Sequence, residues 1–285
     1  MDNENLSNHI PSDDGGDVIV DPKNNLIEKE IQRFKNEHRL LISIWQVSFS
    51  APVKEILKSS GAKVLDVECG YGIWLSEVAQ EYPNATFIGI DSSKNIPTTL
   101  PNNANLIRCD PKKRLPFSDG TFDYVHCRNG SIAFSTDPSI IPEMVRVLKA
   151  GGFIELCEVD AHNVNEGPSM KKIADGGMSL GVTRGVDGMI GEKVDEILLK
   201  NGEITNIVHL QRYGQLGTWG GEKGTMAVEN FRNNWLSLKD QLVEFMNISP
   251  EDFDKLIEKC IRETERFRTY FKTHRIYGQK IELCS

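Results

Sequence analysis

Acidic residues and glycines that could bind a nucleoside stand at the ends of two apolar runs. The first run ends in Asp66 and leads into a turn that contains Gly70 and Gly72, after which an amphipathic segment begins. A glycine turn lets a ligand approach the backbone closely, and the helix after it offers unpaired N–H groups. The second run, residues 85–90, ends in Asp91, where a carboxylate can accept hydrogen bonds from ribose hydroxyls. The pattern predicts a strand, a loop and a helix around a nucleoside site.

Details of this loop favour S-adenosylmethionine over a dinucleotide. A dinucleotide fingerprint requires a third glycine where this chain has Leu75. In addition, the acid Asp66 ahead of the loop is unfavourable for binding a pyrophosphate. The same carboxylate suits the ammonium of a methionine moiety. The stretch resembles the first motif of the class I S-adenosylmethionine-dependent methyltransferases, D-x-G-x-G-x-G, with matches at Asp66, Gly70 and Gly72. An NAD-dependent oxidoreductase is therefore disfavoured.

One residue departs from that motif, because Glu68 stands where the family has its first glycine. Two interpretations stay open. Either the loop relaxes, Glu68 turns aside and the cofactor site works, or the carboxylate repels the cofactor and the chain is a catalytically inactive regulator that binds a protein partner.

The resemblance extends over residues 63–157. It includes the segment L-P-F-x-D-G-T-F-D-Y-V at 115–125 and the junction at 146–155. A weaker likeness near the C-terminus is similar to a broad fungal group of LaeA-like methyltransferases. The resemblance implies an α/β, Rossmann-like, doubly wound and mostly parallel seven-stranded sheet whose last strand is antiparallel. It also implies a methyl acceptor, either a small molecule or a protein, and S-adenosylmethionine as cofactor.

The resemblance also assigns roles to particular residues. The methionine part would lie against the first loop, the ribose against the second strand end, and the adenine near Asp110, which is equally well explained as a simple loop residue. The candidate cofactor-binding residues are Asp66, Glu68, Gly70, Gly72, Asp91, Ser92, Asp110, Leu115 and Arg128. Arg128, at the rim, and His162, a candidate base in an acidic loop, are the catalytic candidates. A solvated loop is the alternative for His162.

Periodicity predicts the remaining elements. Residues 1–24 are polar and predict a disordered tail, and residues 25–285 form one methyltransferase domain. N-terminal helices occupy 25–60, the cofactor-binding core 61–160, and lid and C-terminal helices 161–202 and 216–272. Asp137 and Pro138 predict a helix start, and the glycines at 176–191 predict hinges or turns. Apolar residues at 231–245 predict one helix, Ser249 begins another, and 273–281 predicts a final edge strand.

Composition limits the range of functions. A net charge of −8 over 285 residues disfavours non-specific binding to nucleic acid or anionic membranes. No apolar run is long enough to span a membrane, and the N-terminus lacks a signal-peptide pattern. The six scattered cysteines predict buried reduced thiols rather than disulfides or a metal site. These features predict an intracellular protein of the cytoplasm or nucleus, and they leave its oligomeric state open.

Overall fold

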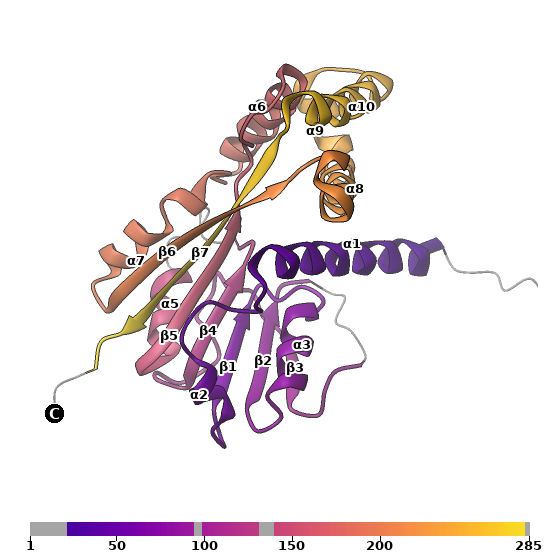
Figure 1. Ribbon diagram of the computed structural model, residues 1–285. Helices are drawn as coiled ribbons and strands as arrows, with labels where there is room; N and C mark the ends of the chain where they lie inside the picture. The colour runs from indigo at the N-terminus through magenta and orange to yellow at the C-terminus, as the bar shows by residue number, and fades with distance from the viewer. Residues whose placement is uncertain (1–21, 94–98, 131–139, 283–285) are drawn as a thin grey trace, which may run out of the picture.

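The computed structural model describes residues 22–93, 99–130 and 140–282. Within them, one sheet has the strand order β3-β2-β1-β4-β5-β7-β6 (Figure 1). The strands are β1 (Lys63–Val67), β2 (Thr86–Asp91), β3 (Ala104–Arg108), β4 (Phe122–Arg128), β5 (Leu148–Val159), β6 (Ile204–Gln215) and β7 (Tyr270–Lys280). Strand β7 pairs antiparallel with both β5 and β6, and the pairs among β1 to β5 are parallel. The predicted α/β sheet of seven strands with an antiparallel last strand is confirmed.

Helices cover both faces of this sheet, as a doubly wound fold requires. They are α1 (Pro22–Trp45), α2 (Lys54–Lys58), α3 (Ile73–Glu81), α5 (Ile140–Val147), α6 (Pro168–Thr183), α7 (Val194–Asn201), α8 (Gly221–Ser237), α9 (Lys239–Met246) and α10 (Pro250–Phe267). Two short 3₁₀ turns, η1 (Ile190–Glu192) and η2 (Thr218–Gly220), complete the described elements. None of the helices in the described ranges has the length and apolar character needed to cross a bilayer.

Alternation along the strands divides the core into two layers. Val64 and Tyr124 pack with α2 and α3 on one face, whereas Leu65 and Val125 pack with α5 and α7 on the other. Because β1 is buried on both faces, its residues are mostly apolar, and Asp66 is the buried exception. The strand therefore holds the loop that follows it on a rigid support.

A third apolar cluster lies beyond one end of the sheet. Helices α6, α8, α9 and α10 contribute most of it, and Leu40 of α1 and Phe271 of β7 join them. Figure 1 shows these four helices gathered at the end of the sheet where β5 finishes and β7 begins, with α1 lying between them and the core strands. The predicted lid remains a prediction, and these helices are the elements that would form it.

The glycines of α6 act differently from the predicted hinges or turns. The helix continues through Gly176 and Gly177 without interruption. An added Cβ would lie 2.8 Å from the Met246 sulfur at Gly176 and 2.7 Å from the Trp235 ring at Gly177. These two glycines therefore allow α8 and α9 to pack closely against α6. The predicted turn is correct only further along, where the helix ends before Gly185.

Other predicted boundaries need correction. The run at 231–245 is divided between α8 and α9 at Leu238. Strand β7 is not an edge strand, because it lies between β5 and β6. Ser249 does cap α10, with its hydroxyl accepting a hydrogen bond from the backbone N–H of Asp252 at 3.1 Å. The predicted helix start at 137–138 and the N-terminal tail up to residue 21 lie outside the described residues.

The described cysteines are all free thiols. Cys127, Cys157 and Cys260 are buried, and burial raises the pKa of each. Cys284 lies outside the described residues. Buried neutral thiols of this kind behave as small apolar side chains.

Candidate functional site

The loop between β1 and α3 has the backbone that a closely approached ligand requires. Glu68, Gly70 and Gly72 have φ angles of 57°, 54° and 65°, all in the left-handed region. The backbone N–H of Gly70 donates to the Asp91 carboxylate at 2.8 Å, which ties this loop to the end of β2. Glycine adopts such angles readily, but for a glutamate they cost free energy. The loop thus keeps a glycine-type conformation at the position where the glycine has been replaced.

Asp66 has a buried partner that the sequence did not reveal. Its carboxylate lies 2.7 Å from His126 Nδ1, and the side chains of both residues are almost fully buried. The imidazole stacks on the Trp74 ring, with 3.6 Å between centroids. In the sheet register Asp66 lies beside His126, so neighbouring parallel strands bring the two together. Part of the hydrogen-bonding capacity of Asp66 is therefore used within the protein.

Glu68 lies among other carboxylates at the ends of the first three strands. Burial, followed by the charges of Asp91 and Asp110, raises the pKa of Glu68 to about 7, and the ammonium of Lys112 partly offsets this. A carboxyl group with such a pKa changes its charge near neutral pH. The charge beside the glycine loop therefore depends on the protonation of Glu68 near neutral pH.

The other predicted cofactor residues lie at the same edge but in different environments. Asp91 also accepts from the backbone N–H of Ser93 at 2.7 Å, and Asp110 accepts from the backbone N–H of Lys112 at 3.1 Å. Ser92 is exposed at the end of β2, whereas the Leu115 side chain is buried in the core at 3% exposure. Asp91 and Asp110 keep acceptor capacity because each carboxylate oxygen can accept more than one hydrogen bond.

Arg128 connects the end of β4 to α1. Its guanidinium lies 2.9 Å from His38 Nδ1, and His38 Nε2 lies 2.8 Å from the carboxylate of Glu77 on α3. Burial and the charge of Arg128 lower the pKa of His38, which favours a neutral ring. His38 is thus a packed residue. His38 therefore connects α1 to the end of β4 and to α3, the helix that follows the glycine loop.

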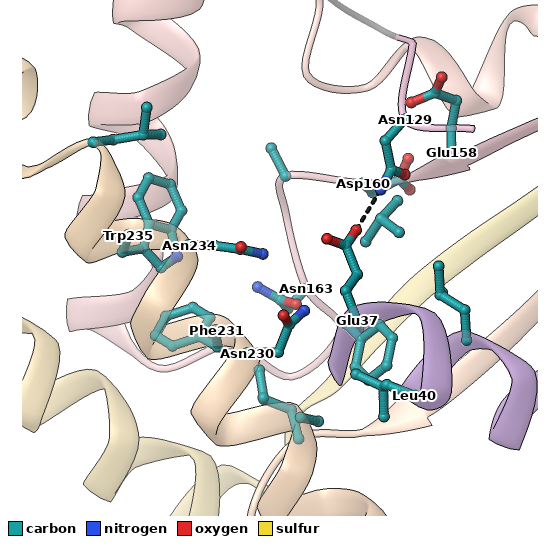
Figure 2. A pocket seen from close by; sticks show the side chains of 17 residues that line it. Glu37, Leu40, Asn129, Glu158, Asp160, Asn163, Asn230, Phe231, Asn234 and Trp235 are labelled. Carbon is teal, nitrogen blue, oxygen red and sulfur yellow. Dashed lines mark hydrogen bonds between the residues drawn. The ribbon is translucent and has the colours of Figure 1, made fainter. Parts of the chain in front are cut away.

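A cavity of about 380 Å³ opens next to Arg128 along the same edge of the sheet. Figure 2 shows its polar side chains, with Glu37 of α1 accepting a hydrogen bond from Asn129 across one side. Asn230 and Asn234 of α8 and the ring of Phe231 face the same space. The sequence carried a signal for this wall, because asparagines at 230 and 234 and aromatic residues at 231 and 235 repeat at helical spacing. The apolar spacing at 231–245 predicts a helix there, and the asparagines on the same helix are what indicates a polar wall.

One acid in the cavity wall belongs to a buried network. Asp160, just after β5, lies 2.8 Å from Lys272 Nζ and 3.0 Å from His274 Nε2. His274 in turn lies 2.8 Å from His209, which contacts Asp195 at 3.2 Å. His209 therefore makes structural contacts. The network fixes the Asp160 side of the cavity to β6 and β7.

His162 is not among the residues that line this cavity, although its neighbours Ala161 and Asn163 are. Its Nδ1 lies 2.9 Å from Glu166, and its Nε2 lies 3.3 Å from Asp175. Both ring nitrogens therefore face carboxylates of α6 and of the loop before it. The structure does not bring His162 to the glycine loop, and its role as a base stays a prediction that this geometry does not favour.

The residues at the glycine loop fit the donor groups of S-adenosylmethionine. That molecule presents an ammonium, a sulfonium, ribose hydroxyls and an adenine amino group, all of which are cationic or hydrogen-bond donors. Asp91 and Asp110 supply carboxylates beside the loop, whereas burial raises the pKa of Glu68 to about 7, so that Glu68 is partly protonated at neutral pH. The acidic set therefore suits a cationic nucleoside and opposes a pyrophosphate.

Comparison with known proteins supports the methyltransferase fold. Residues 64–152 match the model of a family described as a methyltransferase domain. The chain is 33% identical over 141 residues to the "Secondary metabolism regulator laeA" of Coprinopsis cinerea, which covers 47% of this chain and 35% of that protein. It is 25% identical over 105 residues to "Methyltransferase str3" of Strobilurus tenacellus, covering 37% of this chain and 38% of that protein. The match thus spans little more than a third of each relative.

The class of protein follows from the fold, the loop and these matches. The prediction of a class I S-adenosylmethionine-dependent methyltransferase fold, similar to the fungal LaeA-like group, is confirmed. The family match also supports S-adenosylmethionine as the cofactor of this class. Among solved structures, a phosphoethanolamine N-methyltransferase of Haemonchus contortus covers 79% of this chain and 50% of its own, with 17% identity and a TM-score of 0.48. Because this TM-score is low, the assignment of the fold rests on the strand order of the chain itself.

Proposed function

We propose that this chain is an S-adenosylmethionine-dependent methyltransferase that acts on a small-molecule or protein acceptor. The observation that carries the proposal is the loop after β1. It keeps left-handed backbone angles at three positions and is held by Asp91 at 2.8 Å from Gly70. The carboxylates around it match the donor groups of the cofactor, as described above.

The residues of the chain would divide the work of binding. Asp66 and the backbone of Gly70 and Gly72 would hold the methionine part, Asp91 the ribose, and Asp110 the adenine amino group. When bound, the cofactor supplies an electrophilic methyl group on a sulfonium. The chain then has to align the acceptor and exclude water. Holding the two reactants in the correct orientation lowers the activation barrier substantially. The cavity beside Arg128 is the place at this edge of the sheet where an acceptor would fit.

Calorimetric titration with S-adenosylmethionine and S-adenosylhomocysteine at pH 7.5 tests the proposal. The natural chain is expected to show saturable binding in the micromolar range, and NAD is expected to show none. Glu55→Gln is a matched control, because Glu55 lies on α2 with its side chain 84% exposed. Absence of binding in the natural chain and in Glu68→Gly alike would refute the cofactor site.

A second candidate function is a catalytically inactive regulator that binds a protein partner. Glu68 in the place of a motif glycine favours it, and several similar fungal proteins are named regulators of secondary metabolism. The same titration separates the two candidates. If the natural chain fails to bind and Glu68→Gly binds, the regulator is the correct function.

A further inference from the structure

We propose that the cavity between α1, α8 and the end of β5 is the acceptor site, and that it selects a small arylalkyl amine over an anion of the same shape. This inference rests on the proposed function, because the cavity is an acceptor site only if the chain is a methyltransferase. The selectivity itself is a property of the cavity and is measurable without the cofactor.

The position of the cavity suits an acceptor. Asn129, in its wall, follows directly after Arg128 at the end of β4, and Glu158 and Asp160 lie at the end of β5. In the sheet, β4 lies between β1, which carries the glycine loop, and β5. The cavity and the glycine loop are therefore on the same edge of the sheet, one strand apart, where open α/β folds bind their ligands.

The charge of the wall is one-sided. Three carboxylates line the cavity, those of Glu37, Glu158 and Asp160, and the lining set contains no lysine, arginine or histidine. Lys272 lies 2.8 Å from Asp160 but contacts it from outside the lining set, as Arg33 does at 3.7 Å from Glu37. An anionic ligand would therefore enter a space where every charged lining group repels it.

Amide groups add acceptors for a hydrogen-bond donor. Asn163, Asn230 and Asn234 face the cavity in Figure 2, and Asn234 Oδ1 already accepts a hydrogen bond from Arg33 at 2.8 Å, so that Asn163 and Asn230 are the amides offered to a ligand. The Oδ1 atom of Asn230 is buried and accepts no hydrogen bond from the described residues. A buried acceptor without a partner costs free energy until a donor reaches it, and an ammonium supplies three donors.

The remaining wall is apolar and partly aromatic. Phe231 and Trp235 of α8, Phe271 of β7 and Leu40 of α1 contribute apolar side chains to the wall. Aromatic faces attract a cation and also pack well against a flat ring. At about 380 Å³ the cavity is at the small end of ligand sites. Size, apolar wall and one-sided charge together indicate a single small molecule with a flat apolar body and an amine.

Three probes that share an indole ring test the selectivity. Tryptamine is a cation at pH 7.5, tryptophol is neutral, and indole-3-acetate is an anion. Ligand-observed NMR titrations, with and without saturating S-adenosylhomocysteine, are expected to show tryptamine binding at least tenfold more tightly than indole-3-acetate, with tryptophol between them. Equal affinities, tighter binding of the anion, or no binding of tryptamine would each overturn the inference.

Variants locate the source of the selectivity. Glu158→Gln and Glu37→Gln keep the shape of the wall and remove one charge each, so each is expected to lower the amine-to-acid ratio at least threefold. Glu55→Gln, far from the cavity, is expected to leave the ratio unchanged. Circular dichroism checks that each variant is folded. Because the Glu37 side chain is still 12% exposed, Glu37→Gln provides a test even if the buried Glu158 variant does not fold. An unchanged ratio in both folded variants would count against the proposal.

The two proposals can fail separately. Tryptamine selectivity without binding of S-adenosylhomocysteine would support the cavity chemistry and contradict the methyltransferase. Binding of S-adenosylhomocysteine without amine selectivity would contradict only the inference about the acceptor.

Discussion

Replacing Glu68 with glutamine should make the protein more stable at high pH and change it little at low pH. The substitution keeps the shape of the side chain and the left-handed backbone at φ 57°, so it removes only the charge. The ordinary pKa of 4.5 is raised to about 7 in the folded protein by burial and by the neighbouring charge of Asp91. Between these two values the folded state binds more protons than the unfolded state. The contribution of Glu68 to stability must therefore fall as pH rises from about 5 to about 8.

The magnitude follows from the two pKa values. A difference between 4.5 and about 7 corresponds to about 3 kcal/mol once pH is above both values, and to less than 1 kcal/mol at pH 5. Glu68 is only half-buried, and water screens part of the interaction. We therefore expect Glu68→Gln to gain about 2 kcal/mol over the natural chain at pH 8. Glu68→Gly should gain about 1 kcal/mol more, because glycine removes the backbone strain.

Urea unfolding followed by circular dichroism at half-unit steps from pH 5 to pH 8 measures this difference. Glu55→Gln provides the control, since its side chain is 84% exposed and its curve should run parallel to that of the natural chain. A constant difference between Glu68→Gln and the natural chain over this pH range would refute the argument, because it would mean that Glu68 is already ionised in the folded protein at pH 5.

Two further predictions concern packing and the buried acid. Gly177→Ala places a Cβ 2.7 Å from the Trp235 ring, so it should destabilise the protein by about 2 kcal/mol, whereas Ser179→Ala at an exposed position of the same helix should be neutral in thermal unfolding. His126→Phe keeps an aromatic ring but leaves the buried carboxylate of Asp66 without its partner at 2.7 Å, which should cost about 3 kcal/mol in urea unfolding at pH 7.5. A loss below 1 kcal/mol would mean that another group takes over that carboxylate.

Much of the fold could be read from local patterns. The apolar run ending in Asp66, the glycines after it and the acid ending the second run define the first half of the sheet, because strands buried on both faces and tight turns leave strong local signals. Capping also worked where its chemistry is local: Ser249 begins α10, and Gly202 ends α7 with a left-handed φ of 79°. The glycines of α6 were misread because their role depends on a distant neighbour, Trp235, that approaches only in the folded state.

The sequence by itself determined the kind of cofactor site and its unusual residue. Asp66, Gly70, Gly72 and Asp91 lie within one strand–loop–helix–strand unit, and their spacing alone predicts how they meet. The replacement of a motif glycine by Glu68 can also be recognised from the sequence alone. Its backbone angle and its raised pKa needed the structure, since the angle is set by the fold of the loop, and the pKa by burial and by the charges of Asp91 and Asp110.

Only the tertiary structure decided where an acceptor could lie. The cavity takes its acids from α1 and from the end of β5, its amides largely from α8, and its aromatic wall from α8 and β7. These segments are separated by long stretches of chain. The residue pattern within one segment does not predict which other segments it will contact. The partner of Asp66 shows the same limit, because His126 reaches it only through the pairing of β1 with β4. Contacts within one element follow from residue spacing, whereas contacts between elements follow from how the sheet is ordered.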